Sequence, residues 1–231
     1  MSSSPNHAAS SKRNHPVIGT AAGLTTLVSL AVLFLATSEW PPRLDPAPHE
    51  AAGWGLAQLA LSRLSPGGQI TVIVRDTSEF KQPAIDILFR RFKSAIRKGH
   101  ASIRTVHAIE ADPLRLVEVP SGDFMTLLHR APPGSVVVSF LGPPMLTSQQ
   151  REQLGEIKAK VVAFCPGNAP AQIDLRQLFA ARLLDAAVIS RRSPAPGAAR
   201  ARSEAARFDQ LYQTVSATNV ASLYASAHVE P

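Results

Sequence analysis

An α/β fold with a doubly wound, mostly parallel sheet of about five strands is predicted for this 231-residue chain. Short β-branched runs alternate with helical segments of roughly ten to sixteen residues, which is the pattern of βαβ units. Right-handed crossovers between such strands give a flavodoxin-like or Rossmann-like layer. An uncharged apolar run near the N-terminus predicts a single transmembrane helix ahead of this domain.

Composition limits the classes of function. Without the membrane segment and the polar ends, roughly 130–150 residues remain, which is the size of one ordinary domain. The formal net charge of +7 permits attraction to anionic surfaces. Because the basic residues are dispersed, aromatic residues make up only 6% and no nucleic-acid module is recognised, we expect no nucleic-acid partner. Cys165 is the only cysteine in the sequence, so no internal disulfide forms.

Residues 17–37 are predicted to cross the membrane. Residues 17–36 carry no charged side chain, and about 20 apolar residues span the ~30 Å hydrocarbon layer. Lys12 and Arg13 precede this segment. By the positive-inside rule, residues 1–16 are then a cytoplasmic tail, and the main domain is extracytoplasmic, which in a Gram-negative cell means periplasmic.

A cleaved secretory signal is the alternative to an anchor, with Ala36 and Ser38 as the small residues before the cut. The apolar run is longer than the 7–15 residues of a typical signal core, which favours the uncleaved anchor. Gly19 and Gly23 form a G-x-x-x-G pattern on which two such helices can associate. Self-association through this pattern stays open beside a separate protein partner.

The domain is predicted to span residues 51–192, after a stiff Pro-rich spacer at residues 38–50. β-Branched and apolar runs predict strands at residues 70–74, 103–109, 136–140, 161–164 and 186–190. Apolar periodicity predicts helices at residues 51–64, 83–98, 121–129 and 174–184. A further helix begins at a capping box formed by Thr147 and Gln150 and runs to about residue 159.

The segment 83–98 is the most clearly amphipathic of these helices. Its polar side is basic and carries Arg90, Arg91, Lys93, Arg97 and Lys98. The simplest interpretation is a solvated surface, and the alternative is a face for anionic lipid or an acidic partner.

The C-terminal part consists of a predicted flexible linker at residues 193–202 and a helix with a tail at residues 203–231. The helix is predicted over residues 203–215. Phe208, Leu211, Tyr212 and Val215 would lie on its apolar face.

Ligands of open parallel sheets bind at the carboxyl ends of the strands. The residues there that we single out as candidates for ligand binding are Arg75, Asp76, Glu79, Asp112, Gly142 and Asn168. Helix capping and solvated surface explain the three carboxylates more simply than a metal does, so no metal site is predicted. No Gly-rich phosphate-binding motif follows any strand, so no cofactor is predicted.

Cys165 is the sharpest catalytic candidate, because it directly follows a predicted strand, where some α/β hydrolases present their nucleophile. His107 and His129 are the candidate bases, although nothing in the sequence places either of them beside Cys165. The simpler interpretation is a small buried apolar residue.

The run ITVIVRD with its following amphipathic helix, and the later run HAIEADP, carry a resemblance that covers about half of the chain. These features resemble one lobe of a type I periplasmic binding protein, and also auxiliary extracytoplasmic domains of uncharacterised ABC transport systems. Binding proteins of that family close two lobes around a cleft, whereas this chain has the length of one lobe. No functional residue is therefore carried over.

The sequence as a whole predicts a membrane-anchored interaction or sensing domain, as a non-catalytic accessory part of an envelope complex. Two alternatives remain. One is a small-molecule-binding half-module that acts as a dimer, and the other is a Cys165-dependent hydrolase.

Overall fold

The computed structural model describes residues 28–30, 32–33, 44–78, 81–110, 119–143, 146–155, 157–167, 169–191 and 203–225. The chain divides into two compact units, Met1–Arg43 and Leu44–Pro231. In the first unit, residues 28–30 and 32–33 are helical and exposed. The remainder of the predicted membrane segment 17–37 lies outside the described residues. None of the helices within the described ranges has both the length and the apolar character needed to cross a bilayer.

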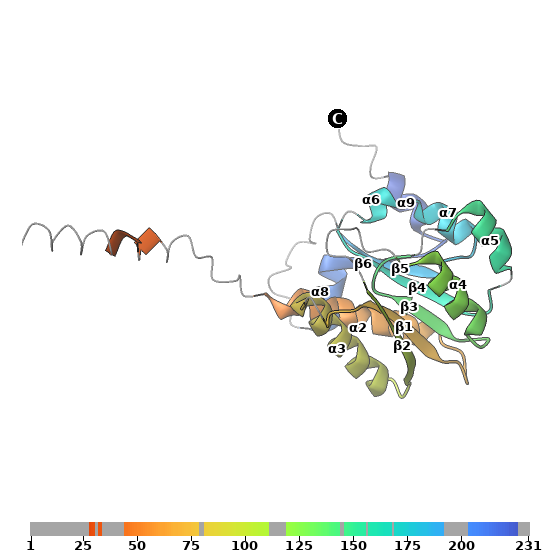
Figure 1. Cartoon of the computed structure of the whole chain (residues 1–231), viewed down its shortest axis with the longest axis horizontal. Coiled ribbons are helices and arrows are strands. Elements are labelled where there is room, and N and C mark those ends of the chain that lie inside the picture. Colours follow the sequence, from red (N-terminus) through yellow and green to blue (C-terminus); the bar gives the residue numbers. More distant parts are fainter. Residues whose placement is uncertain are drawn as a thin grey trace, which may run out of the picture. The chain divides into compact units, whose positions relative to one another are not determined.

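The second unit is built on one six-stranded sheet with the order β2-β1-β3-β4-β5-β6 (Figure 1). Neighbouring strands are parallel from β2 through β5, and β6 runs antiparallel to β5. The strands are β1 (Ile70–Arg75), β2 (Ile103–Ile109), β3 (Val136–Ser139), β4 (Lys160–Cys165), β5 (Ala186–Ser190) and β6 (Tyr212–Val215). The predicted doubly wound, mostly parallel α/β sheet is confirmed, with one strand more than expected.

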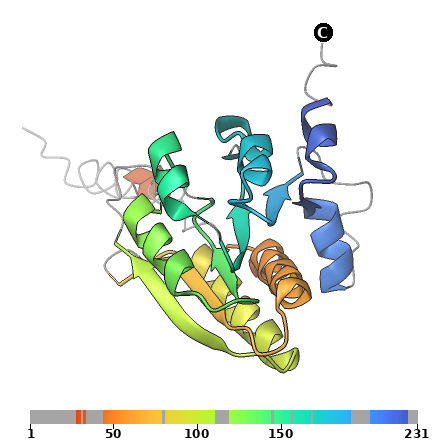
Figure 2. The same ribbon diagram turned by 90° about the vertical axis from the view of Figure 1, so that its right-hand side faces the viewer.

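Helices cover both faces of the sheet (Figure 2). One layer consists of α2 (Pro46–Arg63), α3 (Pro83–Lys98) and α8 (Glu204–Leu211). The other layer consists of α4 (Ser121–Arg130), α5 (Ser148–Leu154), α6 (Ala169–Gln172), α7 (Leu175–Ala180) and α9 (Val220–Ala225). Each layer has its own core, because successive strand residues point to opposite faces. In β1, Val72 and Val74 belong to the first core and Ile73 to the second.

The helix α2 packs unusually closely against its two neighbours. A Cβ atom on Gly53 would lie 2.3 Å from the carbonyl oxygen of Leu88 in α3. A Cβ atom on Gly55 would lie 2.0 Å from the ring of Phe208 in α8. Glycine disfavours helix interiors by about 1 kcal/mol relative to alanine, so these glycines are explained by packing and not by helix propensity.

An ion pair joins the two helices on either side of α2. The guanidinium of Arg91 in α3 donates through Nε and Nη2 to the two carboxylate oxygens of Glu204 in α8. Both side chains are partly buried. The Arg91 hydrogen bonds lower the pKa of the Glu204 carboxyl, which therefore stays ionised at neutral pH.

The first helix begins earlier than predicted, at Pro46 and not at residue 51. Asp45 is its N-cap, and the carboxylate oxygen Oδ1 accepts a hydrogen bond from the backbone N–H of Ala47 at 3.0 Å. Pro46 then occupies the first helical position, where its missing N–H costs nothing. Residues 46–50 of the predicted Pro-rich spacer are therefore helical.

Two other helices end earlier than predicted. The capping box of Thr147 and Gln150 is present as expected, but α5 stops at Leu154, because Gly155 adopts a φ of 63°. The helix α7 follows its N-cap Asp174 and ends at Ala180 instead of residue 184. Arg182 there adopts a φ of 56°, which lies outside the right-handed helical region.

The segment predicted as the end of the last helix is partly a strand. The helix α8 stops at Leu211, and Tyr212–Val215 pairs with β5. Tyr212 packs into the first core and Val215 into the second. Residues three apart lie on one side of a helix but on opposite faces of a strand, so only the strand buries both side chains in this way. The predicted linker 193–202 lies outside the described residues.

Replacement of Gly53 with alanine tests the close packing of α2. We expect Gly53→Ala to lower the free energy of unfolding by about 1–3 kcal/mol, because the added methyl group collides with the α3 backbone. Gly122 in α4 is the matched control, since a Cβ there meets nothing within 4 Å. Gly122→Ala should leave stability unchanged or raise it by up to about 1 kcal/mol. Urea unfolding followed by circular dichroism measures both, and equal effects would contradict the packing.

Candidate functional site

The parallel strands end at one edge of the sheet, and we call the residues after them, 76–78, 110, 140–143, 166–167 and 191, the carboxyl edge. In the order β2-β1-β3-β4-β5, the chain winds first to one side of β1 and then to the other. The gap between β1 and β3 is therefore the topological switch point, where folds of this topology bind ligands. The candidate site consists of the turns around this point.

The turn after β1 is held by its own polar side chains. The carboxylate oxygen Oδ1 of Asp76 accepts a hydrogen bond from the backbone N–H of Ser78 at 2.8 Å. Thr77 donates through Oγ1 to Oδ1 of Asp86 in α3 at 3.3 Å. The N–H of Ser78 lowers the pKa of the Asp76 carboxyl, which favours the charged form. Asp76 is thus a charged group at neutral pH that stabilises the turn.

A buried hydroxyl group shapes the turn after β3. Ser139 is fully buried, and its Oγ donates to the carbonyl oxygen of Gly142 at 2.5 Å. The same Oγ accepts from the N–H of Leu141 at 3.3 Å. Gly142 has a φ of +84°, which glycine adopts without the steric cost that other residues meet. The chain therefore turns sharply at the switch point.

The ends of β4 and β5 are also joined by hydrogen bonds. The N–H of Gly167 donates to Oγ of Ser190 at 3.1 Å. Arg191 donates through Nε to the carbonyl oxygens of Asp209 at 2.7 Å and Tyr212 at 3.0 Å. Arg191 therefore fixes the passage from α8 into β6 at this edge.

Hydrogen bonds join the ends of neighbouring helices of the second layer near the same edge. Gln150 at the start of α5 donates through Nε2 to Oγ of Ser121 at the start of α4, at 2.8 Å. Oη of Tyr224 in α9 accepts from the N–H of Leu175 in α7 at 3.2 Å. The guanidinium of Arg176 lies 4.1 Å from the centre of the Tyr224 ring. These contacts make the rim of the carboxyl edge a rigid frame.

Cys165, the last residue of β4, is completely buried in the second core. Burial raises the pKa of its thiol to about 12, because an apolar environment disfavours the thiolate. A catalytic cysteine needs a lowered pKa and access to substrate. Cys165 has a raised pKa and no access to solvent, so it has neither property of a catalytic cysteine. It fits the simpler interpretation of a small buried apolar residue.

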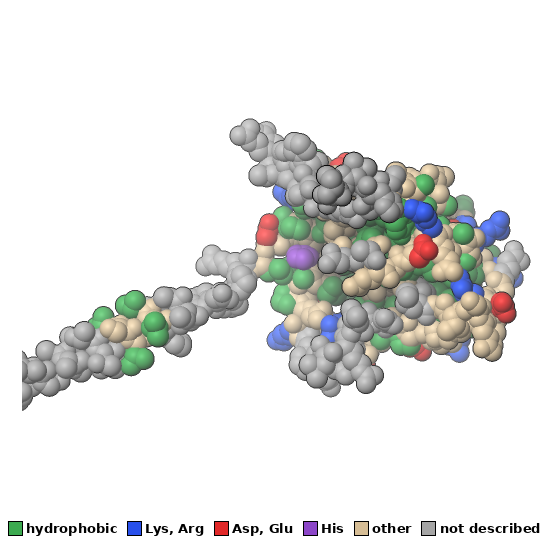
Figure 3. Space-filling view, turned by 90° about the horizontal axis from the view of Figure 1, so that it is seen from above, with side chains coloured by type: hydrophobic (Ala, Val, Ile, Leu, Met, Phe, Trp, Pro, Cys, Tyr) green, Lys and Arg blue, Asp and Glu red, His purple; other side chains and the backbone are tan. Residues whose placement is uncertain are grey.

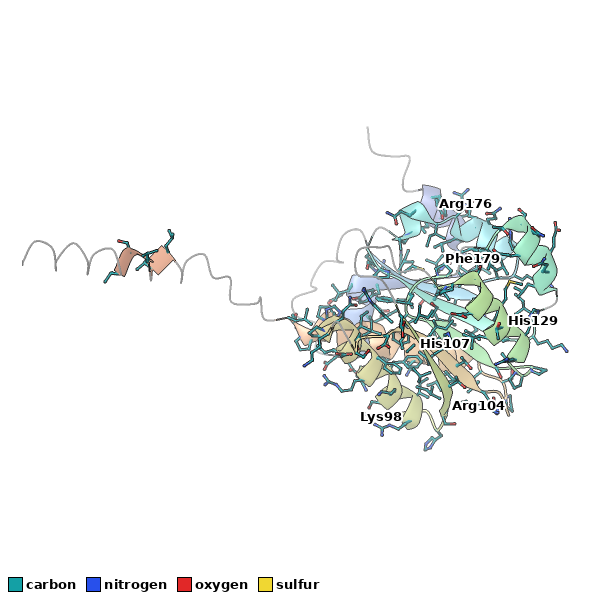
Figure 4. All side chains as sticks on the ribbon, in the orientation of Figure 1. Lys98, Arg104, His107, His129, Arg176 and Phe179 are labelled. Atoms are coloured by element: carbon teal, nitrogen blue, oxygen red, sulfur yellow. The ribbon has the colours of Figure 1, made fainter. Side chains whose placement is uncertain are left out.

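The two candidate histidines lie on elements other than β4, with His107 on β2 and His129 on α4 (Figure 4). His107 lies on β2, which is three strand positions from β4 and thus roughly 14 Å away at ~4.8 Å per strand. Its Nε2 is 3.6 Å from Oδ2 of Asp123 in α4. His129 is at the end of α4, where its Nε2 lies 3.1 Å from the carbonyl oxygen of Leu154. That end of α4 precedes β3, so His129 belongs to the opposite edge of the sheet from Cys165.

The structure brings some predicted ligand-binding residues together. Asp76 and Gly142 follow the neighbouring strands β1 and β3 at the switch point, and the half-buried Arg75 is the last residue of β1. The other candidates, Glu79, Asp112 and Asn168, lie outside the described residues. Within the described ranges, no group of three or more His, Cys, Asp and Glu side chains is placed to hold a metal ion.

Ser139, Ser190 and Arg191 hold this edge together, and the sequence predicted no role for any of them. One signal for Ser139 was available, because it is a single hydroxyl residue within the otherwise apolar run of residues 136–141. A buried hydroxyl requires a hydrogen-bond partner, which predicts a tight turn after such a strand. The role of Arg191 could not be predicted, because it depends on β6, and residues 212–215 were predicted to belong to a helix.

The chain enters the domain at the carboxyl edge. Gly53 in α2 packs beside Leu88 in α3, and Leu61 packs against Gly99 at the C-terminal end of α3. The two helices therefore run in the same direction. Since α3 begins after the carboxyl end of β1, the beginning of α2 and Leu44 before it lie toward this edge as well.

Comparison with known proteins shows that the fold resembles that of several solved structures. No protein-family model matches the sequence, and no curated protein is similar to it. The structure resembles a periplasmic ribose ABC transporter protein from Conexibacter woesei, with a TM-score of 0.47 and 10% identity over 77% of this chain and 60% of that one. It also resembles the arabinose-binding protein AraP from Geobacillus stearothermophilus, with a TM-score of 0.46 and 15% identity over 77% of this chain and 63% of that one.

A third similar structure is an ABC transporter solute-binding protein from Burkholderia graminis in complex with D-arabinose, with a TM-score of 0.46 and 12% identity over 75% of this chain and 61% of that one. The resemblance to periplasmic binding proteins that the sequence predicted is confirmed. The chain spans between 60% and 63% of the length of these three structures. No ligand or residue role is transferred from them.

Cys165 should be inert in the folded protein. We expect iodoacetamide to leave it unmodified at neutral pH and to alkylate it once urea unfolds the chain, where a free thiol has a pKa of about 8.5. Between about 8.5 and the folded value of about 12, the unfolded state has lost a proton that the folded state keeps. The free energy of unfolding should therefore fall as the pH rises through this window.

The variant Cys165→Ala serves as the control, because it removes this contribution to the pH dependence. Rapid alkylation of the native protein at neutral pH would contradict the burial and restore the hydrolase hypothesis.

Proposed function

We propose that this chain is a membrane-anchored extracytoplasmic binding domain that acts as a non-catalytic accessory component of an envelope complex. The observation that carries the proposal is the entry of the chain at the carboxyl edge, next to the topological switch point. In this fold class that edge is the binding edge. Leu44, to which the tether is joined, and the binding edge are thus on the same side of the domain.

The length of the tether gives this arrangement a functional meaning. Six residues, 38–43, separate the proposed membrane segment from Leu44. Seven peptide steps span at most about 25 Å, so the carboxyl edge stays close to the membrane surface. Partners in the same membrane then meet this edge at a high effective concentration. A membrane-embedded protein is the partner that suits such a geometry best.

The chemistry of the edge supports binding over catalysis. Asp76, Ser139, Ser190 and Arg191 are all engaged in hydrogen bonds that hold turns or strand ends. The pKa of Asp76 is lowered, whereas a general acid or base works best with a pKa near the ambient pH. Cys165 keeps its proton. A rigid edge of this kind offers shape and backbone groups to a partner.

The alternative of a dimeric small-molecule-binding half-module is supported by one feature of the sequence. Gly19 and Gly23 in the proposed membrane helix have the spacing on which two helices associate closely. A second copy would then bring its own carboxyl edge near the first, and the two edges would enclose a small-molecule cleft.

Native mass spectrometry on the full-length chain, extracted in mild detergent from its own membranes, tests the proposal. We expect the uncleaved 24.6 kDa chain together with the mass of a different protein. Ser78→Arg places a bulky charge on the carboxyl edge and should abolish the added mass, because Ser78 is exposed there. Ser62→Arg is the matched control on the exposed surface at the far end of α2, and it should keep the partner.

The outcomes separate the candidate functions. A bare chain, or an equal loss of partner in both variants, would contradict binding through the carboxyl edge. A mass of two chains with an added small molecule would support the dimeric half-module. A chain that lacks residues 1–38 would identify the segment as a cleaved signal.

A further inference from the structure

The exposed positive charge of the first helical layer is concentrated on α3 and the beginning of β2. We use the name basic α3 surface for the exposed residues Arg90, Lys93, Arg97, Lys98 and Arg104. Asp86 is the only acidic residue of α3, and it lies in the first turn, where it accepts the hydrogen bond from Thr77. The remaining length of the exposed side of α3 is therefore uniformly positive.

The helix geometry aligns these charges on one side. Arg90, Lys93 and Arg97 are separated by three and four residues and so form one stripe. The ammonium group of Lys93 lies 4.5 Å from the centre of the Phe89 ring, which holds its stem along the helix. Lys98 and Arg104 lie at the same end of the domain (Figure 4). Arg91 is excluded from the surface, because it turns inward to Glu204.

An exposed apolar residue borders these charges. Val106 on the edge strand β2 keeps 46% of its surface exposed. It pairs with Val72, whose side chain belongs to the core under α3, so Val106 points to the same side of the sheet as α3. Basic side chains around an apolar one are the combination found on surfaces that lie at a membrane interface.

The opposite layer has a different distribution of charge. On the face seen from above, the basic and acidic side chains of the described residues are interspersed (Figure 3). Lys160 at the start of β4 is 3.1 Å from Asp185, and the guanidinium of Arg176 in α7 lies over the ring of Tyr224. The concentration of positive charge on successive turns of one helix is therefore a feature of the α3 side.

We propose that the basic α3 surface docks on the anionic phospholipid headgroups of the membrane that holds the anchor. The inference rests on the proposed anchoring. The tether keeps the domain near the bilayer, and the basic stripe of α3, about 12 Å long from Arg90 to Lys98, brings several charges within the ~8 Å Debye length at the same time. Each Lys or Arg near an anionic surface raises membrane partitioning by roughly fivefold.

Docking in this way gives the domain a defined orientation. With α3 lying along the bilayer, the strands run roughly parallel to the membrane plane, because α3 packs along the sheet. The carboxyl edge then opens sideways along the membrane surface. A partner embedded in the same membrane would meet the switch point directly.

The test uses the full-length chain in lipid nanodiscs. Ser102, exposed between α3 and β2, is replaced by cysteine and labelled with a fluorophore, while the buried Cys165 stays unlabelled. Headgroup-linked nitroxide lipids quench the fluorophore only when it is near the membrane surface. We expect at least several-fold stronger quenching in discs with phosphatidylglycerol than in discs of phosphatidylcholine alone, and loss of the difference at high salt.

Matched variants identify the surface that docks. Arg90→Gln, Arg97→Gln and Lys98→Gln together should reduce quenching to the phosphatidylcholine value. The control removes the same charge from exposed positions of the other layer, through Arg130→Gln, Lys158→Gln and Arg182→Gln, and should quench like the parent. Continued protection of Cys165 from alkylation shows that each variant is folded.

Carbonate extraction of membranes from expressing cells separates the two proposals. A chain that carbonate releases would overturn the anchor and the docking with it. A chain that resists extraction but quenches equally in both disc types would overturn lipid docking alone and point to an acidic protein as the ligand of this surface. Equal quenching by the two triple variants would also overturn the assignment to α3.

Discussion

The close approach of α2 to α3 and α8 determines the architecture of one whole side of this domain. Gly53 and Gly55 let α2 sit against the backbone of α3 and the ring of Phe208. The Arg91–Glu204 ion pair joins the two outer helices around it. This packing fixes the direction of α2, and so determines that the chain enters at the carboxyl edge. The proposed relation between tether and binding edge depends on these two glycines.

The carboxyl edge combines rigidity with limited chemical reactivity. Its polar side chains hold the turns after β1, β3 and β4, and Ser139 does so from a fully buried position. Buried hydroxyl groups that are satisfied in this way specify one backbone conformation. An edge of this kind can bind a partner of complementary shape without a change in its own backbone conformation. The protonated Cys165 beneath it contributes packing, as a small apolar side chain would.

The strands and the amphipathic α3 could be predicted because their patterns depend on burial alone. The ends of α5 and α7 could not, because Gly155 and Arg182 adopt left-handed backbone conformations that tertiary packing selects. The strand β6 was mistaken for helix because Phe208, Tyr212 and Val215 have the spacing of one helical face. The pairing with the free side of β5 instead makes Tyr212–Val215 a strand and places its two ends in different cores. For the candidate site, the edge followed from topology, whereas the separation of His107 from Cys165 required the strand order.

We propose that the folded domain lies outside the cytoplasm on an uncleaved anchor. Labelling with a membrane-impermeant maleimide tests it most directly, because the buried Cys165 stays silent and a single introduced cysteine reports its own compartment. We expect Ser62→Cys to be labelled in intact spheroplasts, and Ser3→Cys in the N-terminal tail to be labelled only after permeabilisation. Labelling of Ser3→Cys alone in intact spheroplasts, or of neither before permeabilisation, would contradict it.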